Sequence, residues 1–118
     1  MPETLHYLFV CYANMDRSPT AEVVCARIAQ ENNLDIVASS AGVSRGANRP
    51  VTKEMADLAD TIFVMEPSMV TEMVEGYSQN PAKIVCLDIL DVYAQNDPVL
   101  VQRLGAEMYK YLAREEMI

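Results

Sequence analysis

Short apolar runs alternate along this chain with segments in which apolar residues recur at helical spacing. The runs are almost continuously apolar and contain many residues that favour strands, which is the pattern of strands buried on both faces. Four such strands are predicted, at Leu5–Val10, Asp35–Ala38, 61–65 (TIFVM) and 83–89 (KIVCLDI). The second of them ends in SSAG and is followed by a polar loop, GVSRGANRP.

The segments after the strands predict helices with recognisable starts. Ser18 followed by Pro19 is a suitable N-cap and first helical position, and apolar residues then follow at helical spacing up to Ala29. A short helix is predicted over 52–59 with Thr52 as its cap, another over 67–79, and a last one after Asp97 and Pro98.

This alternation predicts an α/β fold in a single domain, residues 1–118. Strands separated by helices pair in parallel through right-handed crossovers, which gives a four-stranded parallel sheet flanked by helices. In such sheets ligands bind beyond the carboxyl ends of the strands, where the strand order reverses. Cys11 lies at one such end, and Asp88 and Asp91 lie at another.

Composition and charge exclude several classes of protein. Of 118 residues, 51% are apolar and the net charge is −8, so a nucleic-acid or anionic-membrane partner is not expected. The three cysteines are an odd number without a CxxC pair, which argues against a disulfide framework and against a tetrahedral zinc site. No apolar run approaches the roughly 18 residues of a membrane helix, and MPETLHYL lacks a basic signal start, so we expect a cytoplasmic protein with reduced thiols.

The candidate chemistry lies in CYANMDRS, residues 11–18, between the first strand and the first helix. A loop in this place can turn its N–H groups inward and form a nest for a tetrahedral oxyanion at the helix start, without an overall positive protein. Such a nest favours the thiolate of Cys11, and the planar fork of Arg17 matches two phosphoryl oxygens. Asn14 is suited to the left-handed conformation that a tight loop needs, and Ser18 can donate to the thiolate. A Cys and an Arg at this spacing are often a buried residue and a surface charge; the strand before and the helix start after favour the site.

The chain resembles the low-molecular-weight protein tyrosine phosphatases, and most closely a short bacterial subfamily. LFVCYANMDRSPTAE resembles the active-site signature, and SSAGV, ADTIFVMEP and LDILDVYAQNDP follow in the family's order over nearly the whole chain. The resemblance implies a flavodoxin-like fold and metal-independent, cofactor-free hydrolysis of phosphotyrosine proteins or small aryl phosphates through a phosphocysteine. Inorganic phosphate would be a product and an inhibitor. The implied phosphate-binding residues are Tyr12, Ala13, Asn14, Met15, Asp16, Arg17 and Ser18.

The resemblance also implies roles for residues outside this loop. Ser40 corresponds to a serine that hydrogen-bonds Asn14. Asp91 corresponds to the general acid because Asp91-Val92-Tyr93 matches the family's Asp-Pro-Tyr, while Asp88, three residues earlier, stays an alternative. Tyr93 and Tyr12 are candidates to flank an aromatic substrate ring or to serve in packing.

The chain departs from the family at three places. Asp16 replaces a second loop cysteine, Val92 replaces a proline, and a stretch after SSAGV with a supporting histidine is missing.

Two other functions stay open. One is a thiol-dependent arsenate reductase that relays a disulfide, for which Cys86 is the candidate partner, although we expect Cys86 and Cys25 to be buried packing residues. The other is a phosphate- or phosphotyrosine-binding module without turnover.

Overall fold

The computed structural model describes residues 4–118 of the chain. Its centre is a sheet of four parallel strands in the order β2-β1-β3-β4. They are β1 (Leu5–Cys11), β2 (Ile36–Gly42), β3 (Thr61–Val64) and β4 (Ile84–Cys86). The chain winds outward in both directions from the boundary between β1 and β3, so the strand order reverses there. The predicted four-stranded parallel sheet is confirmed.

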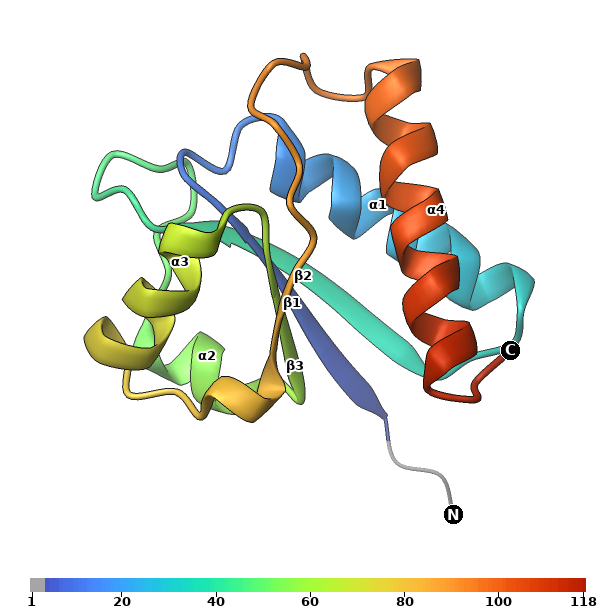
Figure 1. Ribbon diagram of the computed structural model, residues 1–118, viewed down its shortest axis with the longest axis horizontal. Helices are drawn as coiled ribbons and strands as arrows, with labels where there is room; N and C mark the ends of the chain where they lie inside the picture. The colour runs from blue at the N-terminus through green and yellow to red at the C-terminus, as the bar shows by residue number, and fades with distance from the viewer. Residues whose placement is uncertain (1–3) are drawn as a thin grey trace.

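Helices cover both faces of the sheet. Figure 1 shows α1 and α4 beside each other on one face, and α2 and α3 on the other. The elements are α1 (Arg17–Glu31), α2 (Lys53–Leu58), α3 (Pro67–Thr71) with its π-helical continuation η1 (Glu72–Gly76), the 3-10 turn η2 (Pro81–Lys83) and α4 (Pro98–Arg114). Within residues 4–118, none of these helices combines the length and the apolar composition that crossing a bilayer requires.

The core lies between the sheet and its two helical layers. Phe9 of β1 and Phe63 of β3 stack with ring centroids 4.9 Å apart, and Tyr7 and Tyr111 meet Phe63 edge to face at 5.1 and 5.0 Å. Such pairs contribute about 0.5–1.5 kcal/mol each beyond their buried area. These rings join β1 and β3 to α4 through Tyr111.

β1 and β3 differ from the prediction by one residue each, and β2 and β4 differ by more. β2 continues through the two serines to Gly42, since a strand at the edge of a sheet tolerates polar residues that read as a loop in the sequence. β4 is shorter than the predicted 83–89, because Asp88 has a positive φ of 55°. Leu87 and Ile89 still donate backbone bonds to Val64 and Met65, so this segment continues along β3.

The predicted helix starts are confirmed at Thr52 and Asp97, whose side chains accept from the N–H groups of Met55 and Val99. The N-cap prediction for Ser18 is wrong. The helix α1 begins one residue earlier, at Arg17, with Asp16 in the cap position, and Ser18 is its second residue. The Ser18 hydroxyl is therefore free to turn toward Cys11. The helix predicted over 67–79 ends at Gly76, with its last turn in the π form.

Candidate active site

The loop after β1 lies at the carboxyl edge of the sheet, next to the point where the strand order reverses. We call residues 12–16 the phosphate loop. Cys11 is the last residue of β1 and is 3% exposed, and Arg17 begins α1 directly after the loop. The loop therefore combines the carboxyl end of a central strand with the start of a 15-residue helix, as a site for an anion requires.

The sulfur of Cys11 is surrounded by donors. The Asn14 backbone nitrogen lies 3.2 Å from Sγ, and the Ser18 hydroxyl oxygen lies 3.0 Å from it. Asn14 Nδ2 donates to the same hydroxyl at 2.8 Å, which leaves the Ser18 proton free to point at the sulfur or at the Ala41 carbonyl 3.3 Å away. Donors arranged in this way can bind an anionic group at the position of the sulfur.

Asn14 has the left-handed conformation that the sequence predicted for it, with φ of 53°. Its side chain is buried and bonded to Ser18, so it fixes both the turn of the loop and the orientation of the hydroxyl. Asparagine adopts this conformation at lower cost than most residues. The role of Asn14 in holding the loop in shape and that of Ser18 as a donor to the thiolate stay predictions from the sequence.

Arg17 is buried, with a side chain 2% exposed, and is held by two other loops. Its Nη1 donates to the Ile89 carbonyl at 2.8 Å, and its Nη2 lies 2.9 Å from a carboxylate oxygen of Glu66. Asp91 approaches the same Nη2 at 3.6 Å. A buried guanidinium needs such partners, and here they fix its plane beside the pocket that Cys11 opens into.

Glu66 and Asn48 are site residues that the sequence interpretation missed. Glu66 is the second residue after β3 and pairs with Arg17. Asn48 lies in the loop after β2, and its Nδ2 donates to the Asn14 carbonyl at 3.1 Å. The prediction that Ser40 bonds Asn14 is wrong: Ser40 donates to Glu22 of α1 at 2.7 Å. Ser40 belongs to an edge strand, and its side chain is directed to the helix rather than to the loop.

A small pocket opens above the sulfur. Its lining residues are Cys11, Ala13, Met15, Asp16, Arg17 and Asp91. Of the two acids considered from the sequence, the pocket therefore contains Asp91, whereas Asp88 is exposed in the segment after β4. Asp16 lines the same pocket as Cys11. Tyr12, directly after Cys11, is 58% exposed, and Tyr93 is half-buried and packs against the core.

Gly42 allows the phosphate loop to pass close to β2. A Cβ atom at this position would lie 2.6 Å from the Tyr12 carbonyl oxygen and 2.9 Å from the Asn14 nitrogen. Both are backbone atoms of the loop, so Gly42→Ala must displace it.

For Gly42→Ala we expect a loss of about 1–3 kcal/mol in the free energy of unfolding, measured by urea denaturation, together with weaker phosphate binding. Gly105→Ala in α4, where a Cβ meets open space, is the control and should be neutral or stabilising. A Gly42→Ala protein as stable as wild type would contradict the close approach.

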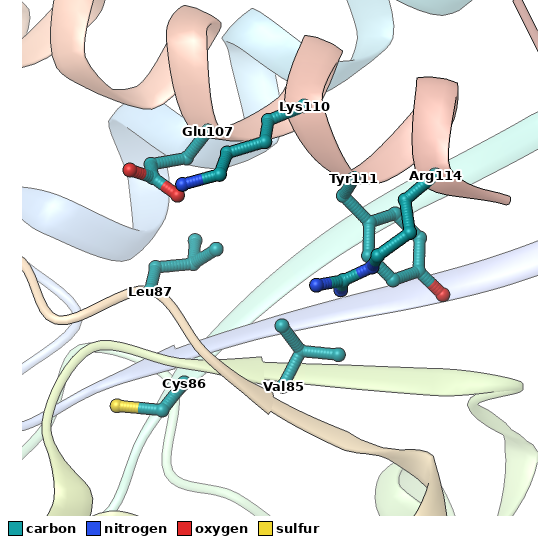
Figure 2. A pocket seen from close by; sticks show the side chains of 7 residues that line it. All are labelled: Val85, Cys86, Leu87, Glu107, Lys110, Tyr111 and Arg114. Carbon is teal, nitrogen blue, oxygen red and sulfur yellow. The ribbon is translucent and has the colours of Figure 1, made fainter.

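The other two cysteines differ from each other. Cys25 is buried in α1 as predicted, and burial raises the pKa of its thiol to about 12. The prediction of burial is wrong for Cys86, which is exposed. Figure 2 shows the pocket between β4 and α4 that Cys86 borders: the side chains of Val85 and Leu87 are directed toward α4, and that of Cys86 is directed away from this helix. Edge strand β4 has a covered face and an open one, which the apolar run IVCL does not reveal.

The part of the chain that the structure describes contains no cluster of side chains suited to bind a metal ion. Across residues 4–118, no cluster of three or more His, Cys, Asp or Glu side chains is placed to hold an ion. The positive charge at the site is that of Arg17, supplemented by the loop N–H groups and the start of α1.

Solved structures with this fold are known, and several are phosphatases by name. A mutant of YwlE from Bacillus subtilis superposes with a TM-score of 0.80 at 20% identity, covering 96% of this chain and 99% of that one. A YwlE arginine phosphatase mutant with a phosphorylated active-site serine gives 0.76 at 21%, covering 92% and 96%. The tyrosine phosphatase Wzb from Escherichia coli K30, in complex with phosphate, gives 0.77 at 19%, covering 95% and 99%. These likenesses establish the fold.

Part of the sequence matches a family model. No curated protein sequence matches the chain. Residues 6–62, which include β1, the phosphate loop and α1, match the family model described as low molecular weight phosphotyrosine protein phosphatase. Over these residues the chain is similar to low molecular weight phosphotyrosine protein phosphatases, and the solved structures extend the shared fold over nearly its whole length.

Proposed function

We propose that this protein hydrolyses phosphotyrosine or other aryl phosphate monoesters through a phosphocysteine on Cys11, without a metal. The observation that carries the proposal is the arrangement around one sulfur: donors from Asn14 and Ser18 at 3.2 and 3.0 Å, and the buried guanidinium of Arg17 at the same pocket. These groups supply the charge stabilisation for which other phosphatases use cations.

In the first step the Cys11 thiolate attacks phosphorus, and the bond from phosphorus to the leaving oxygen breaks. Arg17 and the loop N–H groups bind the phosphoryl oxygens as charge develops on them. The Asp91 carboxyl group, which lines the same pocket, transfers its proton to the leaving oxygen. The products of this step are a phenol and a phosphocysteine.

In the second step the Asp91 carboxylate accepts a proton from water as the water oxygen attacks the phosphocysteine. The bond between sulfur and phosphorus breaks, and inorganic phosphate leaves. The departing thiolate is stabilised by the Ser18 hydroxyl and the Asn14 N–H, which are placed for this at 3.0 and 3.2 Å. The similar arginine phosphatase structure with a phosphorylated active-site serine supports a covalent intermediate at this position.

The geometry favours hydrolysis over a disulfide relay to Cys86. Val10, the neighbour of Cys11, is in register with Val64 of β3, and Val64 is in register with Cys86 of β4. Two strand spacings amount to roughly 9.5 Å, more than the Cα separation of about 7 Å that a disulfide tolerates. A bond from Cys11 to Cys86 would therefore require the sheet to rearrange.

The cytoplasmic location stays a prediction from the sequence.

The exposed edge of the pocket suits a flat ring. Met15 lines the pocket and is 55% exposed, and Tyr12 follows Cys11 with 58% exposed, so apolar surface is available where a phenyl ring would emerge. Phosphoarginine is the substrate class to test beside aryl esters, because a similar structure is named an arginine phosphatase.

The test is phosphate release from phenyl phosphate, phosphotyrosine and phosphoarginine by wild-type protein. We expect hydrolysis of the two aryl esters at a rate that EDTA leaves unchanged, with a phosphoenzyme trapped by rapid acid quench and mapped to Cys11. Inorganic phosphate should inhibit competitively. Activity that is lost in EDTA and restored by a divalent metal would overturn the metal-independent mechanism, and preference for phosphoarginine would overturn the substrate class.

A further inference from the structure

The outer side of the phosphate loop is held by the segment 43–48, which follows β2. Carbonyl groups of four successive residues, from the end of β1 into the loop, each accept a hydrogen bond from this segment. Backbone N–H groups donate three of the bonds and a side-chain amide donates the fourth. The pairs are Val43 N to Cys11 O at 3.0 Å, Ser44 N to Tyr12 O at 2.9 Å, Asn48 N to Ala13 O at 3.0 Å and Asn48 Nδ2 to Asn14 O at 3.1 Å.

Holding these carbonyls outward also orients the N–H groups of the loop. In a planar trans peptide unit, the carbonyl of one residue and the N–H of the next point in opposite directions. The outward Ala13 carbonyl therefore directs the Asn14 N–H inward, and this N–H is indeed 3.2 Å from the Cys11 sulfur. By the same geometry, the outward Asn14 carbonyl directs the Met15 N–H into the pocket.

Asn48 controls both of these peptide units. Its backbone holds the Ala13 carbonyl and its side chain holds the Asn14 carbonyl. Asn14 is also the residue with φ of 53°, a conformation that costs energy and needs support from its surroundings. The hydrogen bond from Asn48 Nδ2 holds the backbone carbonyl of Asn14. The hydrogen bond from Asn14 Nδ2 to the Ser18 hydroxyl holds the Asn14 side chain.

We propose that Asn48 is a positioning residue, whose side chain keeps the Asn14–Met15 peptide turned so that its N–H group faces the bound phosphoryl oxygens and the thiolate. This inference rests on the proposed function of the loop. Asn48 acts from outside the pocket, through the carbonyl of Asn14, and so tunes anion binding and thiolate stability without touching the substrate. The side-chain amide of Asn48 thus links the segment 43–48 to Asn14, the residue of the loop with a positive φ.

The test compares Asn48→Ala and Asn48→Asp with wild type, using Arg49→Ala as the control because Arg49 is the exposed neighbour of Asn48. Asn48→Asp keeps the size of the side chain but loses the donor and places a carboxylate against a carbonyl oxygen. Three readouts are needed: kcat/KM for phenyl phosphate, the rate of Cys11 carboxymethylation by iodoacetate at mildly acidic pH, and the phosphate concentration that protects Cys11 from this reaction.

We expect kcat/KM and the carboxymethylation rate to fall about 10- to 100-fold in both variants, most in Asn48→Asp, with higher phosphate needed for protection. Arg49→Ala should match wild type, and melting curves should show the variants folded at the assay temperature. Wild-type carboxymethylation and wild-type phosphate protection in both variants would overturn the proposal. Absence of hydrolysis by wild type would instead overturn the proposed function, and the two thiol readouts would still decide the role of Asn48.

Discussion

Replacing Cys11 by Ser is expected to lower the rate of aryl phosphate hydrolysis by more than about 10⁴-fold, because the nucleophile acts as a unit with the groups around it. The loop stabilises an anion at this position through Asn14 and Ser18. A serine hydroxyl ionises far less readily than a thiol, so the same donors do not make it an effective nucleophile at neutral pH. Initial rates with phenyl phosphate measure the change.

The exposed thiol of Cys86 provides the matched control for this substitution. Cys86→Ser changes the same atom at a distant site and should retain the wild-type rate. Phosphate binding to the Cys11→Ser protein, measured by calorimetry, should persist, since Arg17 and the loop remain in place. Activity of Cys11→Ser within tenfold of wild type would show that another group is the nucleophile and would sink the phosphocysteine mechanism.

The parts of the fold that could be predicted are those in which burial leaves a local pattern. The central strands β1 and β3 are covered by helices on both faces, so they appear in the sequence as continuous apolar runs. The edge strands were predicted less well. Ser39 and Ser40 interrupt the apolar run of β2 although the strand continues through them, and the left-handed Asp88 ends β4 inside an apolar run. The left-handed backbone conformation of a single residue does not change the spacing of apolar residues, so this spacing does not predict it.

The same distinction applies to the site. Cys11, Asn14, Arg17 and Ser18 belong to one short segment, so the chemistry of their side chains and their spacing predicted that they would meet. Glu66 and Asn48 reach the site from other loops, and such contacts depend on the strand order and on how tightly Gly42 lets two loops approach. A signal for Glu66 was present, because a carboxylate directly after the predicted strand 61–65 lies at the same sheet edge as the phosphate loop. For Asn48, in a polar loop, local sequence offered none.

The assignment of the general acid has a second large expected effect, which depends on the leaving group. Asp91 lines the pocket with Cys11 and approaches Arg17 Nη2 at 3.6 Å, whereas Asp88 is exposed in the segment after β4. Protonation matters most for a poor leaving group. Asp91→Asn should therefore slow phenyl phosphate by about 10²- to 10⁴-fold and an activated nitrophenyl ester much less.

Asp88→Asn is the matched control, because it makes the same change three residues away, and asparagine also accepts the positive φ of 55° at that position. We expect it to change both substrates alike and only slightly. The comparison also separates loss of the proton donor from a shift of Arg17, since a displaced guanidinium would weaken binding of both esters equally. If Asp88→Asn shows the dependence on leaving group and Asp91→Asn does not, Asp88 is the acid, and the segment 88–91 must move over the pocket when substrate binds.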